Sequence, residues 1–196
     1  EASHLEDQWQ EKNGEEYASA WQDLKSSNGI LVPGGFGDRG VEGKINAAKY
    51  ARENNVPYLG ICLGLQVATI EFCRNVLGMK GANSTEFDEN VEYPAVIFMP
   101  EISKTHLGGT MRLGSRPTIW QVEDCKIKRL YGAGDSVDER HRHRYEVNPD
   151  IIDDIERAGL KFVGKDETGQ RCEIFELEDH CYYCLLYTSP SPRDSS

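Results

Sequence analysis

The chain has 196 residues, ordinary hydrophobic content (38%) and a formal net charge of −11. This length suits one domain with a sizeable core, the acidic balance disfavours nucleic acid and anionic membranes as partners, and no apolar run approaches the roughly 20 residues of a membrane span. Six scattered cysteines fit a reducing, cytoplasmic setting rather than a disulfide scaffold, and the start at Glu1 without a methionine indicates a fragment rather than a targeting segment.

The first half of the chain predicts helices alternating with buried strands. Apolar residues recur at helical spacing over 15–25 and 43–54, and a third helix is expected over 63–77. Short apolar runs at 29–32 and 57–61 lie between turn residues, as is typical of strands buried on both faces of a parallel sheet. The order predicts an α/β fold: a doubly wound, mainly parallel sheet flanked by helices. Ligands of such sheets bind beyond the carboxyl ends of the strands.

The second half of the chain has more β-structure. A strand is expected over 95–99, and paired strands over 107–122, 160–163 and 172–177 add β-hairpins to the sheet. A short helix is expected over 149–158, where isoleucines recur at helical spacing.

The last residues differ in kind from the rest of the chain. Residues 184–196 are rich in serine and proline and have no periodicity, which predicts a disordered tail. The run from Cys184 to Asp194 also resembles translated adapter sequence from library preparation, so we treat it as foreign. We therefore expect one domain over 1–183 that is incomplete at its C-terminus.

Cys62 is the candidate nucleophile. It lies between Gly60 and Gly64, after a predicted strand and before a predicted helix. This is the pattern of a nucleophile elbow, in which glycines let the backbone pass close to a strained, exposed nucleophile. The N–H groups at the helix N-terminus favour the thiolate over the thiol. A buried structural cysteine is the alternative, and the two glycines with the preceding strand favour the nucleophile.

The glycine loop before the second helix has three interpretations. Residues 35–40 satisfy G-x-G-x-x-G, but no acidic residue ends the next strand as a dinucleotide site requires. A phosphate-binding P-loop fails as well, because its glycine and hydroxyl positions are not filled. The turn at Gly34 and Gly35 can instead present a backbone N–H to an oxyanion, together with the N–H of Leu63.

Residues 139–146 form the densest charged run. His141 and His143 would share one face of a strand, but nothing nearby supplies further ligands, which disfavours zinc. A solvated charged edge is the ordinary interpretation, and the alternative is that an arginine here binds a small carboxylate through its planar fork. Cys181 and Cys184 have redox-pair spacing, but Cys184 falls in the foreign tail.

Five motifs together resemble the glutaminase (class I glutamine amidotransferase) domain of the CTP synthase family. They are residues 31–37 (LVPGGFG), 60–66 (GICLGLQ), 83–87 (NSTEF), 107–114 (LGGTMRLG) and 140–148 (RHRHRYEVN). The first two are shared by many glutaminases, whereas the last three are specific to this family. The resemblance runs from residue 1 to 183 and is weakest before Asn28.

The resemblance implies that Cys62 attacks the side-chain amide of L-glutamine. Ammonia leaves, and water cleaves the resulting γ-glutamyl thioester. The oxyanion hole is expected at Gly35 and Leu63, and Glu86 and Arg144 are expected to bind the α-ammonium and α-carboxylate of glutamine. The full set of implied glutamine contacts is Gly35, Leu63, Gly64, Leu65, Gln66, Glu86 and Arg144.

In the family, the ammonia passes to a separate amidoligase domain of the same polypeptide, which is absent from this chain. That domain converts UTP to CTP with ATP and Mg²⁺, and GTP activates the transfer. The resemblance implies no cofactor or metal in the glutaminase domain itself. It implies a homotetramer that can stack into filaments, and Phe36 and Arg39, in a mobile lid, are expected as GTP contacts.

One departure from the family concerns the catalytic base. The histidine and glutamate of the family's triad should fall where Ser189 and Ser191 stand. His180 precedes that motif and is not its histidine. We therefore expect the chain as given to be an inactive part of a CTP synthase. The alternatives are a non-catalytic glutaminase-like binding or regulatory module and, third, a mononucleotide-binding domain.

Overall fold

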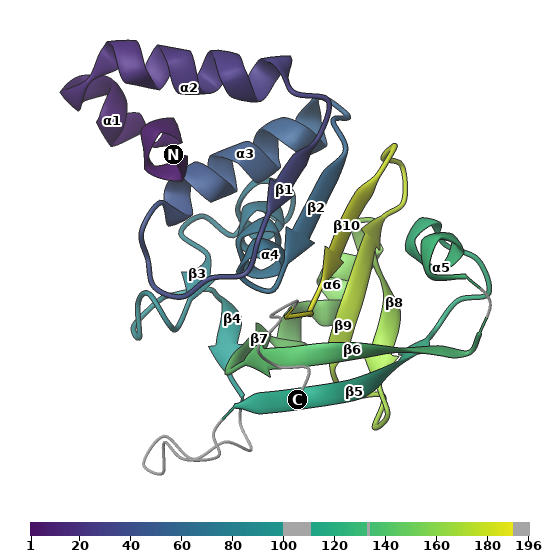
Figure 1. Ribbon diagram of the computed structural model, residues 1–196. Helices are drawn as coiled ribbons and strands as arrows, with labels where there is room; N and C mark the ends of the chain where they lie inside the picture. Colours follow the sequence, from purple (N-terminus) through teal and green to yellow (C-terminus); the bar gives the residue numbers. More distant parts are fainter. Residues whose placement is uncertain (100–110, 133, 190–196) are drawn as a thin grey trace.

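The computed structural model describes residues 1–99, 111–132 and 134–189, and Figure 1 shows helices packed beside a strongly curled sheet. The helices, with η for 3-10 helices, are η1 (Ala2–Leu5), α1 (Asp7–Lys12), α2 (Gly14–Ser26), α3 (Val41–Glu53), α4 (Leu63–Asn75), α5 (Lys126–Tyr131), η2 (Pro149–Ile151) and α6 (Ile152–Arg157). The strands are β1 (Ile30–Val32), β2 (Tyr58–Ile61), β3 (Asn83–Ser84), β4 (Pro94–Phe98), β5 (Arg112–Trp120), β6 (Ser136–His143), β7 (Tyr145–Val147), β8 (Leu160–Asp166), β9 (Cys172–Leu177) and β10 (Tyr183–Leu186).

Most predicted elements are found close to their expected places. The helices predicted over 15–25, 43–54 and 63–77 are α2, α3 and α4, and their ends differ by no more than two residues. The helix predicted over 149–158 is divided into η2 and α6. The strands predicted in the second half correspond to β4, β5, β8 and β9, and the part of the 107–122 prediction before residue 111 lies outside the described residues.

The seven-stranded sheet has the order β1-β2-β10-β9-β8-β5-β6. Strands β1, β2 and β10 are parallel, and the remaining ladders are antiparallel. A smaller sheet has the order β3-β4-β7. The predicted α/β fold with flanking helices and added hairpins is confirmed, and the parallel part of the larger sheet is confined to three strands. The carboxyl ends of β1 and β2 lie side by side, and the glycine loop and Cys62 follow them directly.

Strand β10 corrects the expected domain boundary. It lies between β2 and β9 in the middle of the sheet (Figure 1). Its first residue, Tyr183, is opposite Tyr58 of β2. All residues from Tyr183 to Tyr187 are buried, which is typical of a strand covered on both faces. Residues 184–187 therefore belong to the fold and not to a disordered tail. Residues 190–196 lie outside the described part of the chain, and a foreign origin of the tail stays a prediction.

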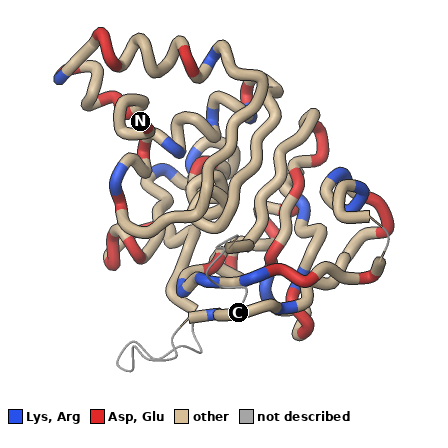
Figure 2. The backbone as a smooth tube through the Cα atoms, in the orientation of Figure 1, with Lys and Arg blue, Asp and Glu red and all other residues tan. Residues whose placement is uncertain are grey.

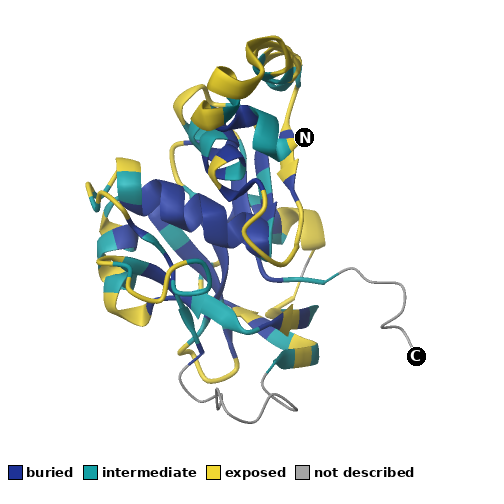
Figure 3. Ribbon diagram, turned by 90° about the vertical axis from the view of Figure 1, so that its left-hand side faces the viewer, coloured by how far each residue is buried: buried dark blue, intermediate teal, exposed yellow. Residues whose placement is uncertain are grey.

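Helix α4 is the centre of the core. It is buried on every side from Leu63 to Cys73, and it is the long dark-blue helix of Figure 3. Such a helix must be covered all round, and α3, β2 and β4 pack against it. An ion pair between Arg52 of α3 and the fully buried Glu71 of α4 joins the two helices, with Nη2 and Oε1 2.7 Å apart. The core thus fixes the N-terminal end of α4, where Cys62 lies.

Positions of acidic and basic residues are spread along the whole backbone (Figure 2). Basic residues are frequent along the paired strands β5 and β6, which contribute Arg112, Arg116, Arg140 and Arg142. Within the described ranges, no helix is both long and apolar enough to cross a membrane.

Candidate functional site

Cys62 lies at a strained turn between β2 and α4. Its backbone has φ 52° and ψ −103°, and positive φ is uncommon for a residue with a side chain. The turn is held because the Cys62 N–H donates to the carbonyl of Leu186, 2.9 Å away. The flanking glycines are required by space: a Cβ at Gly64 would lie 2.0 Å from the Val32 carbonyl oxygen, and one at Gly60 2.6 Å from the oxygen of Gly64. The structure therefore has the local form of the predicted elbow.

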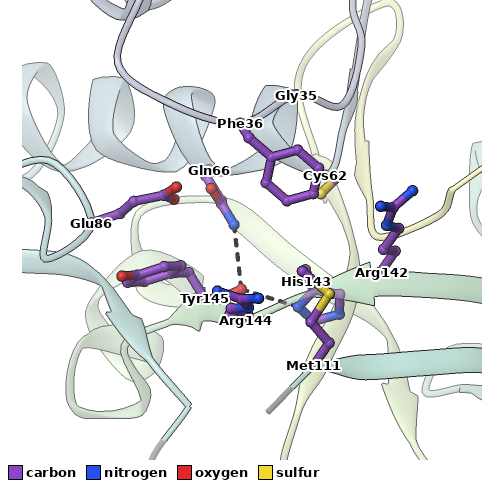
Figure 4. Close-up of a pocket in the computed structure, with 10 residues that line it drawn as sticks. All are labelled: Gly35, Phe36, Cys62, Gln66, Glu86, Met111, Arg142, His143, Arg144 and Tyr145. Carbon is purple, nitrogen blue, oxygen red and sulfur yellow. Dashed lines mark hydrogen bonds between the residues drawn. The ribbon is translucent and has the colours of Figure 1, made fainter. Parts of the chain in front are cut away.

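A cavity of about 310 Å³ opens beside Cys62 (Figure 4). Its walls come from the glycine loop, the elbow, the loop after β3 and the turn between β6 and β7. The lining residues are Gly35, Phe36, Cys62, Gln66, Glu86, Met111, Arg142, His143, Arg144 and Tyr145. The structure thus brings together segments that are far apart in the sequence.

The predicted site residues divide into three groups. Those that line the cavity are Gly35, Phe36, Cys62, Gln66, Glu86 and Arg144. Leu63, Gly64 and Leu65 lie in the buried first turn of α4. A Cβ at Gly35 would be 3.4 Å from the Leu63 side chain, so the two expected oxyanion-hole residues are neighbours. Arg39 does not line this cavity, and its guanidinium pairs with Glu1 at 2.7 Å.

Four lining residues were not predicted as site residues: Met111, Arg142, His143 and Tyr145. Arg142, His143 and Tyr145 belong to the charged run for which carboxylate binding by an arginine was the alternative interpretation. The run alone does not show which of its side chains face a cavity. Their place depends on the turn between β6 and β7, which is a tertiary feature.

Glu86 and Arg144 give the cavity two opposite charges. Burial raises the pKa of Glu86, and a hydrogen bond from the Gly37 N–H and the charge of Arg144 oppose that shift. The Nε atom of Arg144 is buried and has no hydrogen-bond partner in the described part of the chain. A ligand with both an ammonium and a carboxylate group would therefore find a partner for each.

The Cys62 thiol is less acidic than the helix N-terminus alone predicts. Burial raises its pKa to about 11, while a hydrogen bond from the Leu63 backbone lowers it and the charge of Glu86 raises it further. The expected help from the helix terminus is present, but desolvation outweighs it. Cys62 is therefore a thiol at neutral pH and needs a base to become a nucleophile.

Ser189, where the family's histidine was expected, lines a cavity together with Cys62. A second cavity of about 380 Å³ adjoins the first, and its walls are Pro33, Gly34, Gly35, Phe36, Cys62, Arg142, Thr188 and Ser189. His180 lines neither cavity, and its Nε2 lies 2.9 Å from the Ala51 carbonyl oxygen. Ser191 lies outside the described residues.

Comparison with known proteins gives a consistent set of relatives. The profile of the family described as "Glutamine amidotransferase class-I" matches residues 5–185. The CTP synthase of Eremothecium gossypii is 60% identical over 195 residues, which are 97% of this chain and 34% of that protein. CTP synthase 2 of Saccharomyces cerevisiae is 60% identical over 189 residues, 93% of this chain and 33% of that protein. The chain thus spans about a third of the length of these relatives.

The fold agrees with solved structures as well. The glutaminase domain of Trypanosoma brucei CTPS with bound acivicin superposes with a TM-score of 0.85 at 36% identity, over 99% of this chain and 74% of that one. A glutamine amidotransferase from Thermotoga maritima has a TM-score of 0.52 at 16% identity, over 83% of this chain and 56% of that one, which supports the fold alone.

Proposed function

The chain belongs to the class-I glutamine amidotransferase family, among the glutaminase domains of CTP synthases, and from this we propose that it is built to hydrolyse L-glutamine through a thioester on Cys62. The observation that carries the proposal is one cavity that holds Cys62 together with Glu86 and Arg144. A reactive sulfur beside two opposite charges suits an amino acid whose side chain carries the reacting group.

The chemistry proceeds in two halves. In the first half, Cys62 Sγ forms a bond to the amide carbon of glutamine, the thiol proton goes to the leaving nitrogen, and the C–N bond breaks to release ammonia. In the second half, water adds to the thioester carbonyl, the C–S bond breaks, and the thiol takes back a proton. The backbone N–H groups of Gly35 and Leu63 are the proposed donors to the oxyanion in both halves. A proton carrier beside Cys62 is needed in both halves.

The glutamine backbone is proposed to lie between the two charges. The Arg144 guanidinium would meet the α-carboxylate in a fork, and the Glu86 carboxylate would accept from the α-ammonium. Gln66, at the end of the first turn of α4, lines the wall between them. The buried Nε–H of Arg144 has no partner in the described part of the chain and could donate to the ligand, which supports this assignment.

Replacing Glu86 or Arg144 by alanine should weaken glutamine binding. Each change leaves one charged end of the ligand without a partner, and a hydrogen bond to a charged group contributes about 1.5–3 kcal/mol, or about ten- to a hundredfold in Kd. Isothermal titration calorimetry in a Cys62→Ser background would measure Kd without turnover. Arg39→Ala is the matched control, because Arg39 pairs with Glu1 outside the cavity. Unchanged affinity in both cavity variants would show that the site is misplaced.

A diazo-ketone analogue of glutamine should label Cys62 in preference to the buried Cys73, Cys125 and Cys172. With a pKa of about 11, Cys62 is almost wholly a thiol at pH 7. The thiol proton goes to the diazo carbon as the C–S bond forms and N₂ leaves. Mass spectrometry of peptides would locate the label. Iodoacetamide is the control, because it lacks the glutamine backbone and should label the exposed Cys181. Labelling spread evenly over the cysteines contradicts the proposal.

The proposal extends to the longer protein that the relatives represent. Ammonia would pass to an amidoligase domain that uses ATP and Mg²⁺ to convert UTP to CTP, in a cytoplasmic homotetramer activated by GTP. Phe36 lies at the mouth of the cavity, 65% exposed, with the Arg142 guanidinium 5.8 Å from its ring centre. This position supports Phe36 as part of a lid. The proposal that Arg39 contacts GTP rests on the resemblance alone.

A non-catalytic binding module is the second candidate. One observation favours it, since Ser189, and not a histidine, lines the second cavity together with Cys62. Both candidates predict glutamine binding, and only the first predicts turnover when the base is restored.

A further inference from the structure

His141 and His143 form a buried chain of hydrogen bonds behind the cavity. Side chains alternate between the two faces of β6, so His141 and His143 share one face. That face is covered, and the two residues are only 1% and 4% exposed. His141 Nδ1 lies 3.1 Å from His143 Nε2, and His143 Nδ1 lies 3.1 Å from the carbonyl oxygen of Tyr145. The expectation of a solvated edge is therefore wrong for these two residues.

The tautomers of both rings follow from the Tyr145 carbonyl, which is the last acceptor in this series of hydrogen bonds. A carbonyl oxygen only accepts hydrogen bonds, so the proton of His143 must be on Nδ1. Burial lowers the pKa of His143 to about 4 and that of His141 to about 3, so both rings are neutral at pH 7. His143 Nε2 is then an acceptor, and the proton of His141 must also be on Nδ1.

Behind His141 lies a fixed carboxylate. Glu173 Oε2 is 3.6 Å from His141 Nε2. Glu173 in turn accepts from Arg112 at 2.6 Å and from the Thr118 hydroxyl at 2.5 Å. The His141 ring is therefore packed against an anchored group of β9, and its Nε2 has no hydrogen-bond partner within the described residues.

The Tyr145 carbonyl joins three parts of the fold. Besides His143, it accepts from Gln66 Nε2 of α4 at 3.3 Å and from the Tyr187 hydroxyl at 3.2 Å (Figure 4 draws the bonds from His143 and Gln66). The Tyr187 ring also stacks on His143 with centroids 4.0 Å apart. The preceding carbonyl, that of Arg144, accepts from the Met99 N–H at 3.0 Å. The backbone around the Arg144 side chain is thus held from both sides.

We propose that His141 and His143 are positioning residues for glutamine binding, which fix the Tyr145 carbonyl and through it hold Arg144 and Gln66 at the cavity. This inference rests on the proposed function, because it is glutamine that Arg144 and Gln66 would meet. The same geometry removes His143 as a base for Cys62, although it lines the cavity. Both of its ring nitrogens are committed to other partners.

The tautomers can be tested without any substitution in the measured chain. It would be labelled with ¹⁵N-histidine, and nitrogen shifts and long-range proton couplings would be recorded at pH 7 and assigned with single His→Gln variants. Both histidines are expected to be neutral with the proton on Nδ1. A proton on Nε2 of His143 would overturn the inference, because that tautomer cannot donate to the Tyr145 carbonyl. This result does not depend on the proposed function.

Two substitutions of His143 test the consequence for binding. The amide nitrogen of His143→Asn falls near Nδ1 and keeps the donor to Tyr145, whereas the amide of His143→Gln falls near Nε2 and loses it. Calorimetry in the Cys62→Ser background should find glutamine affinity within about threefold of the parent for Asn and at least about tenfold weaker for Gln, the effect of one lost hydrogen bond. His4→Gln is the matched control, because His4 does not line the cavity, and it should leave the Kd for glutamine unchanged.

The outcomes separate this inference from the proposed function. Equal affinities for the Asn and Gln variants, whether both retained or both lost, would overturn the positioning role. If Glu86→Ala and Arg144→Ala still weaken glutamine binding, the proposed function stands in that case. If the parent chain does not bind glutamine at all, the proposed function fails, and the tautomer measurement alone decides whether the hydrogen-bond chain exists.

Discussion

Replacing residues 184–192 by the family-type segment Val-Gly-Val-Gln-Tyr-His-Pro-Glu-Phe is expected to raise glutamine hydrolysis at least about 100-fold, since general acid–base catalysis contributes about 10²- to 10⁴-fold. The segment places histidine at position 189, where the present Ser189 borders the same cavity as Cys62. A thiol with a pKa of about 11 is a poor nucleophile without a base. Release of ammonia also needs a proton donor, and hydrolysis of the thioester needs a base, so one histidine would serve every step.

Ammonia release at saturating glutamine would be compared for the two chains, after circular dichroism has shown that both fold. The matched control carries the same segment with asparagine in place of its histidine, which keeps the packing of the segment and removes the base. The control should hydrolyse glutamine as slowly as the present chain. Equal rates for all three chains would favour the non-catalytic binding module, because both ring nitrogens of His143 are committed to other partners and the segment's histidine would then add nothing.

The elbow could be predicted from the sequence because its determinants are local. Gly60, Cys62 and Gly64 follow a short apolar run directly, and each glycine is required by a close contact within or beside the turn. Glu86 and Arg144 could be placed only through resemblance to a family. Nothing in their own surroundings along the chain shows that two loops more than fifty residues apart meet at one cavity.

Two features could not be read from local pattern. The apolar run from Tyr183 to Tyr187 is too short to identify a strand by periodicity, and the serines and prolines after it give the segment the composition of a tail. Its place in the sheet depends on β2 and β9, which offer it partners on both sides. Likewise, the pKa of Cys62 is set by desolvation from distant segments, which outweighs the local effect of the helix N-terminus.

Gly64→Ala is expected to destabilise the fold strongly and to abolish labelling of Cys62. The new Cβ would lie 2.0 Å from the Val32 carbonyl oxygen and 3.1 Å from the Val32 Cβ. Both groups belong to β1, which pairs with β2 in the sheet and cannot move alone. The Gly64 carbonyl also accepts from the Tyr58 hydroxyl at 3.1 Å, so a shift of α4 would break a buried hydrogen bond. Overpacking typically costs about 1–3 kcal/mol, and we expect the upper end of that range, about 3 kcal/mol, because the clash is with backbone.

Urea denaturation would measure the free energy of unfolding, and a lower midpoint at unchanged slope would show that stability itself has changed. Gly14→Ala is the matched control, because a Cβ there meets nothing within 4 Å and Gly14 begins helix α2. Alanine favours helix over glycine by up to about 1 kcal/mol, so the control should be neutral or slightly more stable. If Gly64→Ala kept the parent's midpoint and its labelling rate, α4 would not approach β1 as closely as the elbow requires. The tight turn would then not be what sets Cys62 at the cavity.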